Sequence, residues 1–152
     1  MTASTNIYKD RLRDGDANYG IKVIKDYSLL PFVYCSPGSL NQVFINLLSN
    51  SIDALEELEK KHDKCIWIQT EQLSETKIAI QIRDNGTGIP ADIHDQIFNP
   101  FFTTKPVGQG TGLGLSVTYR IVESHGGTID VKSEPGWGTQ FSIQLPIRYL
   151  QK

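Results

Sequence analysis

The chain contains 152 residues, which is about the size of one domain. Its content of 39% hydrophobic and 21% charged residues is ordinary for a soluble globular protein, and its net charge of −2 argues against a surface for nucleic acid or anionic membranes, which would need a basic excess. No apolar run approaches the ~20 residues of a membrane span, and residues 1–15 are too polar for a signal peptide, so we expect a cytoplasmic protein.

The first third of the chain predicts a strand followed by a long helix. Residues 1–18 are polar and are interpreted as a linker or the end of a preceding element, so that one domain occupies 19–152. Apolar and polar residues alternate over 20–27, which indicates a strand. Ser36 followed by Pro37 predicts a helix start with the serine hydroxyl as its cap, and this helix is expected to run to about Glu59.

The rest of the chain predicts two hairpins on either side of a second helix. Residues 65–72 and 77–84 alternate well across the short connection LSET, which indicates a hairpin. An irregular stretch over 85–109 leads to a helix at about 111–125, which ends at Gly126–Gly127. Residues 128–133 and 139–146 form a last hairpin around PGWG. Helices and hairpins interleave without regular βαβ units, so we expect a mixed, mostly antiparallel sheet with helices on one face.

The long helix has an apolar face and an opposite polar face that carries two asparagines one turn apart. The apolar face is expected to contain Leu40, Phe44, Leu47, Leu48, Ala54, Leu55 and Leu58, and the polar face Gln42, Asn46, Asn50, Asp53 and Glu57. A polar face is usually only solvated, but a solvated face gains more from Glu and Lys than from Asn, a poor helix former. Amide oxygens at this spacing suit a hard cation such as Mg2+.

The sequence DNGTGIP at 84–90 follows a strand and predicts a binding loop. Asp-Asn-Gly is also turn chemistry, but no strand follows closely enough for a hairpin. Gly86 and Gly88 would let the flat surface of a ligand approach the backbone. Asp84 could accept a hydrogen bond from the exocyclic amine of adenine, whereas guanine presents a carbonyl there and would be repelled.

Alternating glycines at 108, 110, 112 and 114 follow Thr103, Thr104 and Lys105. Their spacing fits neither G-x-x-x-x-G-K-[ST] nor G-x-G-x-x-G, which disfavours a P-loop and a Rossmann phosphate site. A glycine-rich approach to a helix N-terminus remains a ready site for polyphosphate oxygens. Lys105 is the natural cation for the terminal phosphate, and the glycines would give the preceding loop the mobility of a lid.

Together these segments resemble the catalytic, ATP-binding domain of sensor histidine kinases, in the GHKL superfamily with gyrase-type and heat-shock-chaperone ATPases. NLLSNSIDAL, DNGTGIP, FNPFFTTK and GTGLGLS are similar to the family's N box, first glycine box, F box and second glycine box. The resemblance covers about residues 20–147. It implies the Bergerat fold, an α/β (α+β) sandwich of a mixed, mostly antiparallel sheet with about three helices on one face. ATP with Mg2+ would be held beneath a mobile lid.

The resemblance also implies roles for individual residues. Asn50 matches the magnesium ligand, Asn46 the polar residue one turn earlier, Asp84 the adenine-reading aspartate, and Thr139 the threonine that shares a water with that aspartate. With Lys105 on the phosphates, Asn46 and Asn50 form the implied catalytic set. The other implied nucleotide-binding residues are Gly86, Gly88, Phe101, Phe102, Thr104, Gly108, Gly110, Thr111, Gly112, Leu113 and Gly114.

Two departures from the superfamily pattern bear on the reaction. The ATPases carry a glutamate that activates water at the place of Asn46, and a neutral amide cannot take a proton, so we expect negligible hydrolysis and transfer to an outside nucleophile. Many histidine kinases carry a lysine where this chain has Asp53, whose role the sequence leaves open.

The phosphoacceptor histidine is expected to lie outside this chain. His62, His94 and His125 lack the context of the family's H box, on a dimerisation helix. The resemblance therefore implies a monomeric catalytic fragment of a protein-histidine kinase that does not autophosphorylate alone. Its implied partners are a histidine-bearing dimerisation domain, to which residues 1–18 would lead, and indirectly a response regulator. The alternatives are a GHKL protein-serine kinase or ATPase module, or a non-catalytic nucleotide-sensing module.

Overall fold

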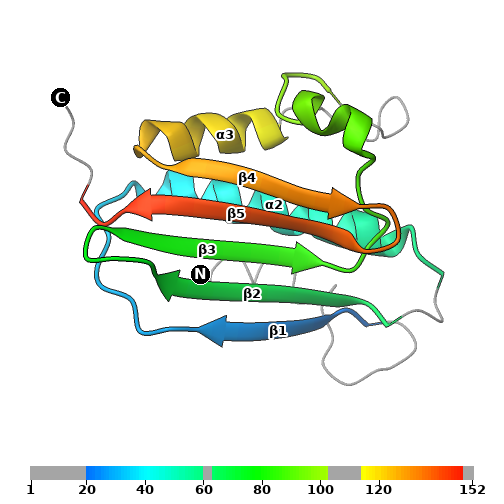
Figure 1. Ribbon diagram of the computed structural model, residues 1–152, viewed down its shortest axis with the longest axis horizontal. Coiled ribbons are helices and arrows are strands. Elements are labelled where there is room, and N and C mark those ends of the chain that lie inside the picture. Colours follow the sequence, from blue (N-terminus) through cyan, green and yellow to red (C-terminus); the bar gives the residue numbers. More distant parts are fainter. Residues whose placement is uncertain (1–19, 60–62, 103–113, 149–152) are drawn as a thin grey trace.

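The computed structural model describes residues 20–59, 63–102 and 114–148, in which one five-stranded sheet is covered by helices on one face (Figure 1). The elements in chain order are β1 (Lys22–Tyr27), α2 (Pro37–Glu56), β2 (Cys65–Gln72), β3 (Lys77–Asp84), the 3-10 helix η1 (Ala91–Gln96), α3 (Gly114–Ser124), β4 (Thr128–Glu134) and β5 (Gly138–Pro146). The strand order is β1-β2-β3-β5-β4. None of the described helices is long and apolar enough to cross a membrane.

The sheet is mixed and mostly antiparallel, as the sequence predicts. The β2–β3 hairpin has the predicted bounds, because its strands alternate between buried and exposed residues. β4 and β5 form the last hairpin, and β5 pairs with β3 in the centre of the sheet. β1 and β2 are parallel neighbours joined through α2, a βαβ crossover that the sequence analysis did not anticipate.

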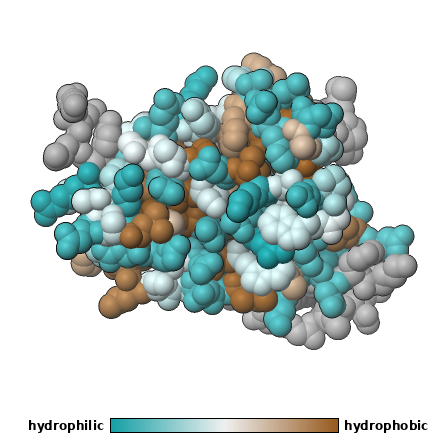
Figure 2. All heavy atoms as spheres, viewed as in Figure 1, coloured by the Kyte–Doolittle hydropathy of each residue, from teal (hydrophilic) through white to brown (hydrophobic). Residues whose placement is uncertain are grey.

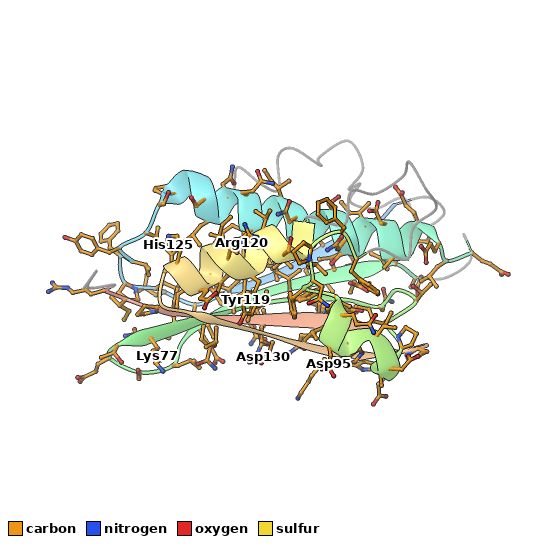
Figure 3. The ribbon with its side chains drawn as sticks, turned by 90° about the horizontal axis from the view of Figure 1, so that it is seen from above. Lys77, Asp95, Tyr119, Arg120, His125 and Asp130 are labelled. Carbon is orange, nitrogen blue, oxygen red and sulfur yellow. The ribbon has the colours of Figure 1, made fainter. Side chains whose placement is uncertain are left out.

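The long helix α2 supplies most of the helical side of the core. Its buried residues are Leu40, Val43, Phe44, Leu47, Leu48, Ser51, Ile52 and Leu55. Val43 and Ile52 were not predicted there, and the predicted Ala54 and Leu58 are only half-buried. The buried arc is wider than one stripe because α2 packs against both the sheet and α3, and α3 lies on the same face of the sheet as α2 (Figure 3).

The ends of the two helices are joined by a histidine. The His125 Nε2 accepts a hydrogen bond from the Ser36 backbone N–H over 3.0 Å, and its Nδ1 lies 2.7 Å from the carbonyl of Ile121. Ser36 is the N-cap residue of α2, but its hydroxyl donates to Ser39 Oγ rather than to a backbone N–H, so the predicted hydroxyl cap is wrong. α2 ends at Glu56, three residues before the predicted end. Gly126 ends α3 with a φ of 73°, as predicted.

Candidate functional site

Asp84 is a buried carboxylate at the end of β3, on the side of the sheet that α2 covers. Only 2% of the residue is exposed. The Gly86 N–H donates to its Oδ1 over 2.8 Å, and Thr139 of β5 lies directly opposite in the register of the two strands. Both residues that the sequence analysis linked through a shared water are therefore neighbours across two strands.

Burial raises the pKa of the Asp84 carboxyl from 3.8 to about 6, because the charged form loses its hydration. The Gly86 N–H, the Ser51 hydroxyl, the Thr139 backbone and the positive charge of Arg83 each lower the pKa and limit the rise. A carboxylate in this state gains from any additional donor. The exocyclic amine of adenine is such a donor, and a hydrogen bond to a charged group contributes about 1.5–3 kcal/mol.

Thr139 is held by Ser133, which the sequence analysis did not single out. Thr139 is 4% exposed, and its Oγ1 lies 2.8 Å from the Oγ of Ser133 on β4. Ser133 Oγ donates to the Gly138 carbonyl over 2.8 Å and accepts from the Ile89 N–H over 2.7 Å. One hydroxyl thus connects both strands of the last hairpin with the end of the binding loop.

The binding loop that follows Asp84 is fixed at both ends. The Asn85 side chain accepts from the Cys65 N–H over 2.8 Å and donates to the Asp63 carbonyl over 2.6 Å, which fastens the loop to the start of β2. Gly88 has a φ of 81°, and a Cβ there would collide with the Glu134 carbonyl, so only glycine fits. Gly86 lies between Asp84 and Ala54 of α2, where a Cβ would come within 2.8 Å of the Ala54 Cβ.

The two asparagines of α2 differ in what they contact. Asn46 Nδ2 donates to the Gly114 carbonyl over 3.0 Å and to Thr118 Oγ1 over 3.3 Å, and its Oδ1 accepts from Gln42 Nε2 over 2.8 Å. Asn46 therefore connects α2 with the first turn of α3. Asn50 is half-buried, and its amide makes no hydrogen bond within residues 20–59, 63–102 and 114–148. Of the two, Asn50 has the amide that can accept a ligand.

Ser51 is a site residue that the sequence analysis missed. It is 1% exposed, and its Oγ has no hydrogen-bond partner among the described residues. The hydroxyl lies close enough to the Asp84 carboxyl to lower its pKa without reaching good hydrogen-bond geometry. A buried hydroxyl without a partner is costly, so this position favours a ligand or water beside Asp84. The sequence feature that could have identified Ser51 is its position on a helix face that otherwise consists of leucine and isoleucine.

The F box begins on an anchored residue and continues into a strained one. The Phe98 ring packs 5.7 Å from Tyr119 of α3 and 6.4 Å from Phe141 of β5, measured between ring centroids. Phe101 has a φ of 65°, a left-handed conformation that costs a non-glycine residue about 1–3 kcal/mol, and it is 74% exposed. Phe102 is half-buried against the core. The exposed, left-handed Phe101 thus lies between two residues that pack against the core, Phe98 and Phe102.

Several predicted phosphate residues cannot be placed. Thr104, Lys105, Gly108, Gly110, Thr111, Gly112 and Leu113 lie outside the described residues. Gly114, the last of the alternating glycines, begins α3, and its carbonyl is the one that Asn46 holds. The described part of the candidate site therefore contains the residues predicted to bind adenine, Asp84, Gly86, Gly88 and Thr139, with Asn46 and Asn50 on the covering helix.

The donor set fits Mg2+ rather than a metal held by several protein ligands. The described residues contain no group of three or more His, Cys, Asp or Glu side chains that could hold a metal ion. Mg2+ usually keeps several waters and takes one or two protein ligands together with phosphate oxygens. The Asn50 amide, which bonds to none of the described residues, agrees with this pattern.

The described histidines have structural partners. His94 Nε2 lies 2.9 Å from the carbonyl of Ile89, and both ring nitrogens of His125 are engaged at the end of α3, where Figure 3 labels it. His62 lies outside the described residues. These contacts give His94 and His125 structural roles within the described chain.

Residues 35–149 match the family described as histidine kinase-, DNA gyrase B-, and HSP90-like ATPase. The signal transduction histidine-protein kinase AtoS of Escherichia coli (strain K12) is 46% identical over 108 residues, which are 71% of this chain and 17% of AtoS. The chain spans only 15–17% of the length of the first curated relatives that it matches.

Solved structures with the same fold agree with this match. The catalytic domain of histidine kinase ThkA has a TM-score of 0.78 at 30% identity, covering 96% of this chain and 89% of the domain. A structure of ThkA in complex with the response regulator protein TrrA has a TM-score of 0.75 at 26% identity, covering 99% of this chain and 40% of that one.

Proposed function

The chain belongs to the family of histidine kinase-, DNA gyrase B- and HSP90-like ATPases, in which it is the ATP-binding catalytic domain of a sensor histidine kinase, and from this premise we propose that it passes the γ-phosphoryl group of Mg·ATP to a histidine on a separate dimerisation domain. The observation that carries the proposal is the buried Asp84 at the end of β3, under a helix whose Asn50 amide has no partner in the described chain.

The adenine side of the site selects the base. Asp84 accepts from the exocyclic amine, and the buried hydroxyls of Ser51 and Thr139 are the nearest groups for an ordered water beside it. Guanine would bring a carbonyl oxygen against the carboxylate, so the same geometry rejects it. Base discrimination therefore comes from a group that is already fixed before the nucleotide binds.

The phosphate side positions the nucleotide and balances its charge. Asn50 is the residue that would hold Mg2+, which when bound neutralises charge on the phosphate oxygens. Lys105 and the glycine-rich amides before α3 steady the phosphates by sequence position, and Phe101 and Phe102 lie where the lid joins the domain. Catalysis then consists mostly of positioning and electrostatic stabilisation.

Asn46 accounts for transfer rather than hydrolysis. Its amide is neutral, and both ends of it are engaged with Gln42, Gly114 and Thr118, so it cannot take a proton from water. Transfer of the phosphoryl group therefore requires a nucleophile from outside this domain. The dimerisation domain supplies that histidine, a response regulator receives the phosphoryl group afterwards, and the cytoplasm supplies the ATP.

A calorimetric titration tests the nucleotide site. ADP and a non-hydrolysable ATP analogue are titrated with and without Mg2+ into the wild type, Asp84→Asn and the control Asp130→Asn, which makes the same change at an exposed residue of β4 (Figure 3). We expect Mg2+-enhanced binding by the wild type and Asp130→Asn and none by Asp84→Asn. Equal binding by Asp84→Asn would overturn the assignment of the adenine site.

A transfer assay tests the reaction. The chain is incubated with γ-labelled ATP and a separately produced dimerisation domain of a related histidine kinase, and the labelled product is treated with acid. We expect acid-labile label on the added domain, since phosphohistidine is lost in acid whereas phosphoserine is retained. Acid-stable label would identify a protein-serine kinase, and steady release of free phosphate would identify an ATPase.

A further inference from the structure

The open face of the sheet carries an arginine held between two tryptophan rings. The Cζ of Arg83 lies 5.0 Å from the ring centroid of Trp67 and 4.2 Å from that of Trp137. Trp67 of β2 is directly opposite Arg83 of β3, and Trp137 lies in the turn between β4 and β5. This face, shown in Figure 2, is otherwise mostly hydrophilic and lies away from α2. The three residues are called the tryptophan clamp below.

The clamp acts on the strand end that carries the adenine-reading carboxylate. Arg83 immediately precedes Asp84, and successive residues of a strand point to opposite faces, so the rings hold the strand from behind the carboxylate. The Nε of Arg83 is buried and has no hydrogen-bond partner among the described residues. The two ring faces are therefore the contacts that compensate its burial, as in a desolvated cation–π interaction.

The turn that carries Trp137 packs directly on the binding loop. Gly138 has a φ of 119°, and a Cβ there would collide with the Asp84 carbonyl and lie 2.9 Å from the Asn85 Cα. The Gly136 N–H donates to the Thr87 carbonyl over 3.3 Å. Whatever fixes this turn also fixes Asp84 and the first residues of the loop.

We propose that Trp67, Arg83 and Trp137 are positioning residues for adenine recognition, because they fix the 135–138 turn against β3 and so keep Asp84 and residues 85–88 in the conformation that binds the base. This inference rests on the proposed function and adds to it residues that do not touch the nucleotide. Arg83 also contributes its charge, which lowers the pKa of Asp84, whereas the groups that face Asp84 from α2 and β5, Ser51 and Thr139, are uncharged.

Titration with ADP and Mg2+ tests the positioning role. Trp137→Ala removes one ring without touching the strand, and Trp137→Phe restores a ring in its place. Phe32→Ala, at a residue that is 99% exposed, serves as the control for loss of an aromatic side chain. We expect about fivefold to thirtyfold weaker binding by Trp137→Ala, from the size of a cation–π contact, with recovery in Trp137→Phe and no change in Phe32→Ala.

The pH profile separates positioning from simple support of the fold. Arg83→Met removes the charge, so the pKa of Asp84 rises and the pH at which half of the ADP affinity is lost in acid moves upward. Arg83→Lys keeps a charge, so its midpoint stays near that of the wild type. A contact that only supports the fold would weaken binding without moving the midpoint. Protonation of the ADP phosphates affects all variants equally, so it does not change the comparison between them.

The outcomes distinguish this inference from the proposed function. If the folded wild type does not bind ADP, the proposed function fails, and the clamp has no base to position. If the wild type binds ADP and needs Asp84, but Trp137→Ala binds equally well and Arg83→Met has the wild-type midpoint, the clamp alone is overturned. Thermal unfolding of each variant identifies any that does not fold. If Trp137→Ala or Arg83→Met does not fold, the affinity of Trp137→Phe and the pH midpoint of Arg83→Lys decide whether the clamp positions Asp84.

Discussion

At the scale of single residues, burial of the Asp84 carboxylate in the proposed adenine site lowers the free energy of unfolding of the nucleotide-free domain. A carboxyl whose pKa is about 6 in the folded chain and 3.8 in the unfolded chain binds its proton more tightly when folded. The free energy of unfolding therefore falls as the pH rises from about 4 to 6, and this loss stays complete above pH 6. In the proposed site, the exocyclic amine of the bound adenine offsets this cost by donating to the carboxylate.

Replacing Asp84 by asparagine should separate stability from binding. The neutral amide keeps an acceptor for the Gly86 N–H but has no charge to desolvate. We expect the free energy of unfolding at pH 7.5 to rise by about 1–3 kcal/mol, the scale set by a pKa shift of about two units, with little change at pH 4. Urea denaturation at the two pH values measures this, and a variant less stable than the wild type at both would contradict the argument.

Adenine affinity should fall as the pH is lowered through about 6. Protonated Asp84 carries a hydrogen where the exocyclic amine must donate. The fraction of protein that can bind adenine therefore falls as the pH drops below the pKa of Asp84 in the nucleotide-free protein. We expect about tenfold weaker binding at pH 5 than at pH 7.5, from the ionised fraction at pH 5. Adenosine is the appropriate probe because it does not titrate in this range, and an affinity independent of pH would argue that Asp84 does not contact the amine.

Asn50 should control the effect of Mg2+ but not the fold. Its side chain is half-buried and bonded to no described residue, so Asn50→Ala removes no hydrogen bond that the structure describes. We expect unchanged thermal unfolding, loss of the Mg2+-dependent gain in ATP-analogue binding, and loss of phosphoryl transfer. The matched variant Gln42→Ala, on the same polar face but exposed, should keep both. Transfer at the wild-type rate by Asn50→Ala would remove the magnesium assignment.

The sequence singled out residues whose chemistry is local and gave no signal for those whose position depends on packing. Asp84 and Asn50 stand out because their types are unusual at the end of a strand and on a helix face. Ser51 and Ser133 look ordinary in the sequence, and they become site residues only because α2 covers β3 and β4 pairs with β5. Arg83 required the register of β2 and the position of a turn more than fifty residues later.

At the scale of elements, Asn46 connects α2 with the beginning of α3. Its amide joins the Gly114 carbonyl and the hydroxyl of Thr118, a residue with 0% exposure. The segment that contains the second glycine box therefore enters α3 at a point fixed by the same helix that carries Asn50. This gives Asn46 a structural role beside the catalytic one proposed for it.

Asn46→Ala should loosen the first turn of α3. The change leaves the Thr118 hydroxyl and the Gly114 carbonyl without their partner, and an unpaired buried polar group costs about 1–3 kcal/mol. We expect a lower free energy of unfolding and faster hydrogen exchange at the start of α3. Gln42→Ala removes only an exposed bond to the same asparagine and should cost less. Equal costs for the two variants would show that the connection to α3 does not contribute.

Alternation and helical periodicity located the elements but not all of their partners. The β2–β3 hairpin follows from its own sequence, because each strand has one buried face. The parallel pairing of β1 with β2 does not, since it depends on a long crossover whose direction no local pattern records. The predicted end of α2 was too late because Leu58 continues the apolar spacing after the helix has ended at Glu56.

At the scale of the whole molecule, the described parts form a nucleotide site without a phosphoacceptor. The helices and the binding loop form the proposed adenine site on one side of the sheet, and the open face carries the tryptophan clamp. The described histidines are engaged: His94 at the carbonyl of Ile89 and His125 between the ends of α2 and α3. Phosphorylation of His125 on Nε2 would break the bond that joins the two helices, and phosphorylation on Nδ1 would break its contact with the Ile121 carbonyl of α3.

The chain alone should therefore bind ATP without labelling itself. Incubated with γ-labelled ATP and Mg2+, it is expected to take up no acid-labile label and to release little free phosphate, because Asn46 cannot activate water and the engaged histidines cannot attack. Addition of a dimerisation domain should then produce label on that domain only. Acid-labile label on the chain alone would contradict this, and the variants His62→Gln, His94→Gln and His125→Gln would show which ring had accepted it. If His125→Gln abolished such label, the contact between Ser36 and His125 would have to open during the reaction, and the two helices could not be the fixed frame that positions Asn46 and Asn50.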